Sequence, residues 1–218
     1  SACLVGSEMC IRDSYRIDTT DAIRPACPCF ADNPRLAVDS FGVYVTQNEF
    51  NMTNAPLTFY GSQIYAIAKS QLVALQPAPY FVHYGGMMIG GMIGDALQPA
   101  LNQSNAPAEF FASSLYRGLS TSKRLGVWAL TNQAQLDSGG VPTLSSVLIS
   151  SEVYGHPPFA LQKGSPALLN TDDDRMDDVV YANGMLWASL YSVVRVVGET
   201  VNRSGIAWFA IRPQLKQN

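Results

Sequence analysis

A chain of 218 residues with 47% hydrophobic and 14% charged residues can bury a substantial core, and this composition excludes an intrinsically disordered protein. The formal net charge of −3 provides no basic surface, so nucleic acid is not an expected partner. No segment reaches the roughly 20 apolar residues that a membrane-spanning helix needs. Frequent glycine and proline between short aromatic runs are typical of an all-β protein.

The first distinctive motif in chain order is CPC at residues 27–29. A disulfide across a single intervening residue is strained. A metal site would need further cysteine or histidine ligands at fixed spacing, and His83 and His156 are the only histidines. The motif predicts a tight loop, in which the role of Cys27 and Cys29 stays open.

Two segments carry the pattern of a strand, a glycine-containing turn and a second strand. They are RLAVDSFGVYVT at residues 35–46 and RMDDVVYANGMLWASL at residues 175–190. Gly42 and Gly184 mark the turns, because glycine accepts the positive φ that tight hairpins require. Asp39 is expected to accept backbone N–H groups in the first turn, as aspartate side chains commonly do.

A four-residue pattern of a bulky residue, an aromatic residue, alanine and an aliphatic residue recurs three times. The copies are IYAI at residues 64–67, VWAL at 127–130 and WFAI at 208–211. In a strand the aromatic residue and the alanine point to opposite faces. The constant alanine predicts a position where two sheets approach closely. The glycine-rich run at residues 85–94 predicts another close approach, as a loop or strand packed against a neighbour.

These repeats predict an all-β fold, a partial β-propeller of about three blades with about four short strands each. In the middle unit, EFFASS at residues 109–114 is the matching strand. A β-sandwich whose hairpins look alike by coincidence is the alternative. The predicted core consists of the repeated hydrophobic positions Leu36, Val38, Val43, Val45, Ile64, Ala66, Ile67, Val127, Trp128, Leu130, Leu186, Trp187, Trp208 and Ile211.

Four runs carry a family resemblance: CPCFADNPRLAVDSFGVYVTQNEFN, GSQIYAIAKSQL, RLGVWALTN and DDRMDDVVYANGMLWASL. They resemble a group of bacterial secreted or cell-surface β-propeller proteins of undefined function, and the resemblance covers most of residues 15–213. The architecture of that group is distantly similar to that of sialidases. The resemblance implies an extracellular or cell-surface binding or scaffold module, with a glycan or a protein as ligand. A glycan-active hydrolase is the alternative.

The hydrolase alternative depends on catalytic residues that the sequence does not identify. Sialidase chemistry requires an arginine cluster for the substrate carboxylate, a tyrosine nucleophile and acidic partners. The spacing of Arg35, Arg124, Arg175 and Arg212 does not place these side chains together. Residues 38–42 match only part of the Asp-box motif of sialidase-type blades. No catalytic residue is therefore assigned.

The densest charge in the chain is the run TDDDRMDD at residues 171–178. Calcium favours several carboxylate oxygens that converge within one loop, and Asp172, Asp174 and Asp178 could supply them. The glycine and terminal glutamate of an EF-hand loop are missing. A solvated loop before a strand is the alternative, and no cofactor other than calcium is suggested.

The organisation of the chain predicts an incomplete propeller at residues 15–218. Three blades do not close a ring, because propellers typically have four to eight blades. Residues 4–14, LVGSEMCIRDS, resemble the translation of an adapter used in preparing DNA sequencing libraries. Residues 1–14 are therefore predicted to be a non-native segment, to be set aside when the fold is considered.

Overall fold

The computed structural model describes residues 14–19, 27–53, 56–115 and 121–215. These residues form mostly antiparallel β-structure, and the all-β prediction is confirmed. The predicted non-native segment lies outside the described residues, apart from Ser14. Among the described residues, no helix is long and apolar enough to span a membrane.

The first sheet is a four-stranded antiparallel meander in the order β1-β2-β3-β4. Its strands are β1 (Cys29–Val38), β2 (Gly42–Asn51), β3 (Thr58–Ala68) and β4 (Phe81–Tyr84). A single-turn helix, α1 (Lys69–Val73), follows β3. A hairpin of β5 (Met88–Ile89) and β6 (Met92–Ile93) comes next.

The second sheet has the order β7-β9-β10-β11, and the third has the order β8-β14-β15-β16. The strands of the second sheet are β7 (Gln98–Pro99), β9 (Glu109–Ser113), β10 (Thr121–Thr131) and β11 (Thr143–Gly155). Those of the third are β8 (Leu101–Asn102), β14 (Met176–Ala182), β15 (Met185–Val194) and β16 (Arg203–Ile211). The remaining elements are the 3-10 helix η1 (Gln133–Ser138) and a two-stranded sheet formed by β12 (Ala160–Leu161) and β13 (Leu168–Leu169).

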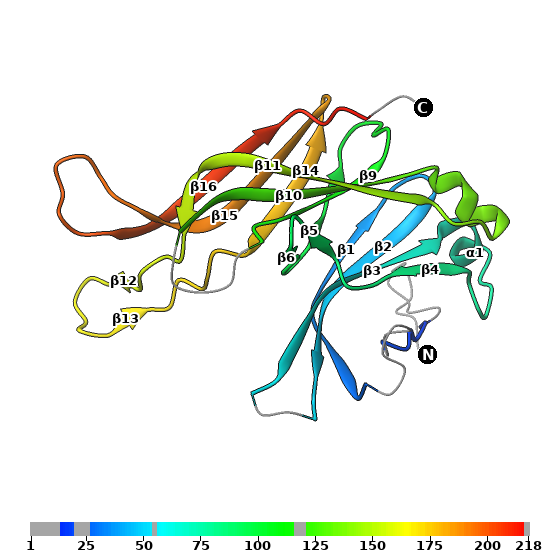
Figure 1. The fold of residues 1–218 in the computed structure, drawn as a ribbon, viewed down its shortest axis with the longest axis horizontal. Coiled ribbons are helices and arrows are strands. Elements are labelled where there is room, and N and C mark those ends of the chain that lie inside the picture. The colour runs from blue at the N-terminus through cyan, green and yellow to red at the C-terminus, as the bar shows by residue number, and fades with distance from the viewer. Residues whose placement is uncertain (1–13, 20–26, 54–55, 116–120, 216–218) are drawn as a thin grey trace, which may run out of the picture.

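The second sheet lies between the other two (Figure 1). Its strand β9 contributes to two separate cores, because successive side chains point to opposite faces. Phe110 stacks on Tyr181 of the third sheet, with ring centroids 5.5 Å apart. Phe111 meets Tyr44 of the first sheet edge to face, with ring centroids 6.3 Å apart. The fold therefore consists of three stacked sheets with a core on each side of the middle one.

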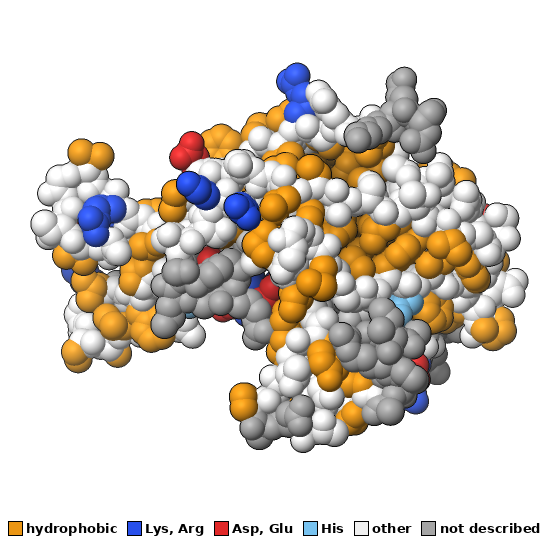
Figure 2. Space-filling model, viewed as in Figure 1, with side chains coloured by type: hydrophobic (Ala, Val, Ile, Leu, Met, Phe, Trp, Pro, Cys, Tyr) orange, Lys and Arg blue, Asp and Glu red, His pale blue; other side chains and the backbone are white. Residues whose placement is uncertain are grey.

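The three sheets also meet through their first strands. β1 contacts both β7 and β8, and β7 and β8 are separated only by Ala100. Ala100 is fully buried and its N–H donates to the carbonyl of Phe110. One continuous segment thus supplies an edge strand to the second sheet and then to the third. Figure 2 shows hydrophobic side chains on much of the visible surface and few charged ones.

The predicted turns occur, but the two glycines serve different purposes. Asn183 and Gly184 have φ values of 51° and 78°, as a tight hairpin turn requires. Gly42 is not in the positive-φ region, so that part of the prediction is wrong. A Cβ at Gly42 would lie 2.6 Å from Cζ of Tyr44, so glycine at this position leaves room for the tyrosine ring. Asp39 accepts the N–H groups of Phe41 and Gly42 at 2.7 Å, which confirms its predicted role in the turn.

Half of the predicted core positions are buried, namely Ile64, Ala66, Ile67, Val127, Trp128, Leu130 and Leu186. Three are partly buried: Val43, Val45 and Ile211. The prediction is wrong for Leu36, Val38, Trp187 and Trp208, which are exposed. On β15, Leu186 and Ala188 face the second sheet, and strand alternation turns Trp187 to the opposite face.

The repeated alanine marks a buried position in two of its three copies. Ala66 and Ala129 are buried, whereas Ala210 is exposed and Phe209 beside it is buried. In the third copy, therefore, the aromatic residue packs toward the second sheet and the alanine faces the other way. The predicted strand at residues 109–114 is confirmed as β9, whose five residues are all buried.

Two loop predictions can also be compared with the structure. Gly90 and Gly91 form the turn between β5 and β6, and a Cβ on Gly90 would lie 3.0 Å from Leu148, so the predicted close packing is confirmed. The CPC loop carries a disulfide between Cys27 and Cys29, a pairing that the sequence left open.

Candidate functional site

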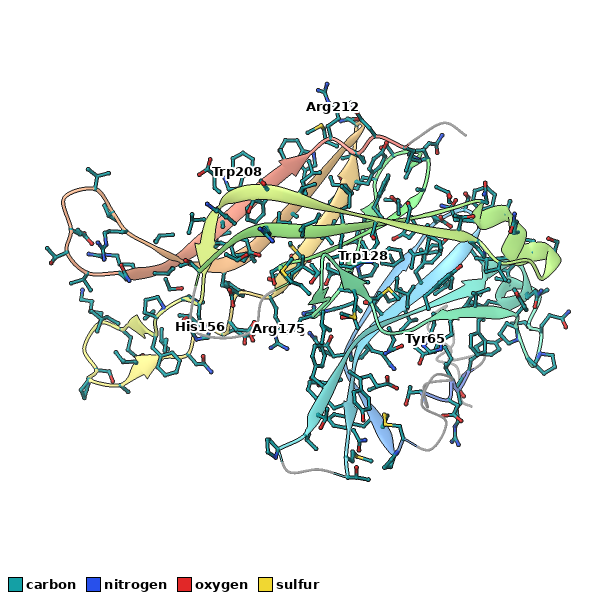
Figure 3. All side chains as sticks on the ribbon, in the orientation of Figure 1. Tyr65, Trp128, His156, Arg175, Trp208 and Arg212 are labelled. Carbon is teal, nitrogen blue, oxygen red and sulfur yellow. A yellow bond between two sulfur atoms is a disulfide. The ribbon has the colours of Figure 1, made fainter. Side chains whose placement is uncertain are left out.

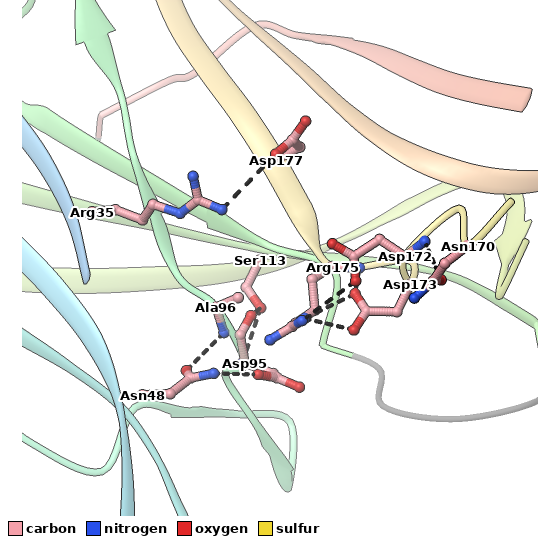
Figure 4. Close-up of polar contacts among 10 residues, drawn as sticks. All are labelled: Arg35, Asn48, Asp95, Ala96, Ser113, Asn170, Asp172, Asp173, Arg175 and Asp177. Atoms are coloured by element: carbon pink, nitrogen blue, oxygen red, sulfur yellow. Dashed lines mark hydrogen bonds and ion pairs between the residues drawn. The ribbon is translucent and has the colours of Figure 1, made fainter. Parts of the chain in front are cut away.

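Buried polar side chains gather where the three sheets meet (Figure 4). Asn48 comes from β2, Asp95 from the loop between β6 and β7, and Ser113 from β9. Each is at most 2% exposed. Arg175, which precedes β14, directs its guanidinium toward this group from the third sheet. We call these four residues the polar junction.

Asn48 and Ser113 hold the loop at Asp95 from two sides. Asn48 Nδ2 donates to Asp95 Oδ1 at 2.8 Å, and the N–H of Ala96 donates to Asn48 Oδ1 at 2.9 Å. Ser113 Oγ donates to the Asp95 carbonyl at 2.8 Å and accepts the Asp95 N–H at 3.2 Å. Ala96 has a φ of 46°, a strained value for a residue with a side chain, and these bonds hold it there.

A serine on β3 extends the network to a second strand of the first sheet. Ser62 Oγ donates to Asn48 Oδ1 at 2.9 Å and accepts the N–H of Leu97 at 3.2 Å. The Ser62 N–H donates to the carbonyl of Gly94 at 3.0 Å. Such a network makes the loop a rigid bridge between sheets, since a buried polar group costs free energy when its partner is removed.

Arg175 places a positive charge among several carboxylates. Its Nε lies 2.7 Å from Asp173 Oδ2, and its Nη2 lies 3.8 Å from Asp172 Oδ1. Burial alone would lower the pKa of Arg175, but the hydrogen bond to Asp173 and the charges of Asp173, Asp95 and Asp172 raise it. The guanidinium thus stays charged and links the acidic loop to the junction.

Asp174 is the most unusual acid near the junction. It is 1% exposed, and neither carboxylate oxygen has a hydrogen-bond partner among the described residues. Burial raises its pKa to about 6, and the charges of Asp173 and Asp95 act in the same direction, whereas the nearby backbone N–H of Asp174 itself and the charge of His156 lower it. This carboxyl can therefore hold a proton close to neutral pH.

The three residues predicted as calcium ligands have different environments. Asp172 is exposed and lies beside Arg175, Asp174 is buried, and Asp178 is exposed on β14. Within the described part of the chain, no group of three His, Cys, Asp or Glu side chains is placed to hold a metal ion. Calcium in this loop stays a prediction. The alternative, a loop wholly exposed to solvent, is wrong for Asp174, because that side chain is buried.

The arginines that the hydrolase alternative requires are dispersed. Arg35 pairs with Asp177 at 3.9 Å, and Arg175 pairs with Asp173. Arg124 is exposed on β10. Figure 3 shows Arg212 at the far end of the third sheet from Arg175. Among the described residues, these side chains form no common carboxylate-binding cluster.

A second buried acid, Glu109 on β9, was not predicted from the sequence. Its Oε2 accepts a hydrogen bond from Asn102 Nδ2 at 2.7 Å, while Oε1 has no hydrogen-bond partner among the described residues. Burial raises its pKa well above the ordinary value, and the charge of Asp39 adds to this effect, whereas the hydrogen bond from Asn102 lowers the pKa. The available signal was a glutamate at the start of a strand whose next three residues are apolar.

No protein-family model matches the sequence, and no curated protein matches it significantly. The geometry of the chain itself therefore carries the functional argument.

Proposed function

We propose that residues 15–218 belong to a β-propeller that acts as a binding or scaffold module outside the cell or at its surface. The observation that supports this proposal is the middle sheet, which buries both of its faces against neighbouring sheets. A β-sandwich has two sheets and one core. Stacked four-stranded sheets with adjacent first strands suit blades arranged around an axis.

The arginines in and beside the polar junction favour binding over catalysis. Arg35 and Arg175 are each engaged with an aspartate. Asn48 and Ser113 use their polar atoms to hold the loop at Asp95. A junction whose groups hold one another is suited to a rigid scaffold that presents ligands on its loops or outer faces.

The proposal is tested on the full chain by combining ligand binding with an activity assay. A ligand that binds the folded state raises its melting temperature by mass action, so a panel of glycans and proteins is screened by thermal shift. We expect at least one saturable increase and no turnover of fluorogenic glycosides. Glycoside turnover that Glu109→Gln or Asp174→Asn abolishes, and that the control Asp177→Asn leaves intact, would overturn the proposal.

A further inference from the structure

Two arms, drawn in yellow and orange, project beyond the second and third sheets (Figure 1). The first arm, residues 156–170, carries β12 and β13, and the second arm, residues 194–203, joins β15 to β16. The N–H of Gly155, at the base of the first arm, donates to Oγ of Ser192, near the base of the second, at 3.2 Å. The two arms therefore leave neighbouring points of the molecule.

Both arms expose large hydrophobic side chains. They are Phe159, Leu161, Leu168 and Leu169 on the first arm, and Val196, Val197 and Val201 on the second. Leu161 is 87% exposed, and Val197 is fully exposed. Exposed hydrophobic side chains that occur singly need no explanation, but a group of them on two adjacent projections indicates an interaction surface.

The second arm is folded so that Val197 stands at its tip. The N–H of Glu199 donates to the carbonyl of Val196 at 3.0 Å, which closes a four-residue turn with Val197 inside it. Arg203 Nε and Nη2 donate to the two carboxylate oxygens of Glu199 at 2.6 and 2.8 Å. Hydrogen bonds thus shape the tip, while Val197 buries none of its surface.

A further sheet stacked on the third sheet would not cover these arms. The pairing of β15 with β16 ends at Val194 and Arg203, so the exposed valines of the second arm lie beyond the sheet. β12 and β13 form a sheet of their own. The arms therefore stay available for a partner in the β-propeller that we propose.

The charges of the arms are mostly positive. The basic residues are Lys163, Arg195 and Arg203, and the acidic residue is Glu199. The chain as a whole has a formal net charge of −3, so the arms differ in sign from the rest of the molecule. The acidic run begins after the first arm, where Asp172 and Asp173 pair with Arg175. The arms thus combine exposed hydrophobic side chains with a net positive charge.

This combination fits the surface of a bilayer that contains anionic lipids. Hydrophobic side chains at such a surface enter the boundary between headgroups and acyl chains, while lysine and arginine are attracted to the anionic headgroups. Protein interfaces depend mainly on tryptophan, tyrosine and arginine, and leucine and valine are under-represented among the residues that dominate their binding energy. The exposed hydrophobic residues of the arms are mostly leucine and valine, which favours a lipid over a protein partner.

We propose that the two arms hold the protein on the surface of an anionic lipid bilayer. Leu161 and Val197 enter the interface together with the hydrophobic side chains beside them. Lys163 and Arg195, both exposed, contact the headgroup phosphates. The inference goes beyond the proposed binding function, because it concerns how the module is held at a surface and not which ligand it binds.

The test measures co-sedimentation of the full chain with vesicles of phosphatidylcholine alone and with vesicles of phosphatidylcholine mixed with phosphatidylglycerol. We expect saturable binding to the mixed vesicles and at least about tenfold weaker binding to phosphatidylcholine alone, because the basic residues are attracted to the anionic headgroups. Added salt should weaken the binding, since it screens exposed charges. No binding to the mixed vesicles, or equal binding to both kinds, would overturn the proposal.

Two valines provide a matched pair of variants for the hydrophobic contribution. Val197→Ser should weaken binding to the mixed vesicles about tenfold, because valine gains more free energy than serine on leaving water. Val73→Ser is the control, since Val73 is 74% exposed but lies on α1, on the opposite side of the molecule (Figure 1). Both side chains are exposed, so the melting temperatures should stay close to that of the unmodified chain. Equal loss of binding in the two variants would contradict the assignment.

Two arginines test the contribution of charge. Arg195→Gln removes a positive charge from the second arm and should weaken binding about fivefold. Arg212→Gln removes a positive charge that lies after the end of β16, away from the arms (Figure 3), and binding should not change. A change of the same size in both variants would rule out contact between the arms and the headgroups.

The outcomes separate a lipid from a protein partner and this proposal from the broader one. Self-association of the full chain that Val197→Ser abolishes, without binding to vesicles, would assign the arms to a protein interface and overturn the proposal. If vesicle binding fails while a glycan or protein ligand raises the melting temperature, the binding function stands. Turnover of glycosides with the control pattern described above would remove the binding function and leave the result with vesicles unaffected.

Discussion

Asn48 on β2 and Asp95 in the loop before β7 are joined by a buried 2.8 Å hydrogen bond across 47 residues of sequence. The same asparagine accepts hydrogen bonds from Ala96 and Ser62. One side chain therefore connects the first sheet to the loop that leads into the second. This connection controls how the sheets are held together, and it can be tested directly.

Asn48→Ala is expected to lower the free energy of unfolding by about 1–3 kcal/mol, because it leaves buried polar groups without partners. Urea denaturation monitored by circular dichroism measures the change. Asn202→Ala is the matched control, since Asn202 accepts an exposed hydrogen bond from Arg195, and its cost should stay within about 0.5 kcal/mol. Equal costs for the two variants would show that the junction does not stabilise the fold.

Several strands could be predicted from local pattern, whereas strand β11 and the buried faces of β1, β15 and β16 could not. Trp187 and Leu186 are both hydrophobic, so either register of β15 would place a large apolar residue in the core. The choice depends on the opposite sheet, where Phe110 and Val127 face Leu186 and Ala188 across the shared core. That information is tertiary and has no local signal.

The polar junction was likewise beyond prediction from the sequence. Asn48, Asp95 and Ser113 come from distant segments, and each stands in an ordinary strand or loop context. No short motif contains them, because only the stacking of the sheets brings them together. The acidic run at residues 171–178 was visible in the sequence, but the burial of Asp174 within it was not.

A second prediction contrasts two tryptophans. Trp128 is buried between the first and second sheets, and Trp128→Ala should lower the free energy of unfolding by about 3–5 kcal/mol. Trp187 is 44% exposed, so Trp187→Ala should cost markedly less. Chemical denaturation of both variants measures the difference. A larger cost at Trp187 would mean that the outer face of the third sheet is covered.

A third prediction concerns the pH dependence of stability. The pKa of Asp174 is raised by burial from 3.8 to about 6 in the folded chain. The fold thus favours the protonated carboxyl, and this contribution to stability is fully present below pH 3.8 and is lost as the pH rises through about 6. Asp174→Asn keeps a neutral group at every pH. Relative to the unmodified chain, the variant should therefore gain stability between about pH 4 and pH 6.

Urea denaturation of both proteins at intervals from pH 4 to pH 7 measures how their difference in stability changes with pH. Asp178→Asn is the control, because Asp178 is exposed and is not among the charges that shift the pKa of Asp174. Parallel stability curves for Asp174→Asn and the unmodified chain would contradict the raised pKa.

The last prediction concerns the turn between β1 and β2. A Cβ at position 42 would lie 2.6 Å from Cζ and 2.7 Å from the hydroxyl oxygen of Tyr44. That hydroxyl donates to Asp39 Oδ2 at 2.9 Å, so the ring cannot move without loss of a bond that fastens the turn. Gly42→Ala should lower the free energy of unfolding by about 1–3 kcal/mol, as overpacking does. Tyr44→Phe frees the ring from Asp39, so Gly42→Ala should cost less when it is added to the Tyr44→Phe variant than when it is made in the unmodified chain. Chemical denaturation measures both effects. If Gly42→Ala lowers the free energy of unfolding equally in the unmodified chain and in the Tyr44→Phe variant, the Asp39 bond is not the source of the strain.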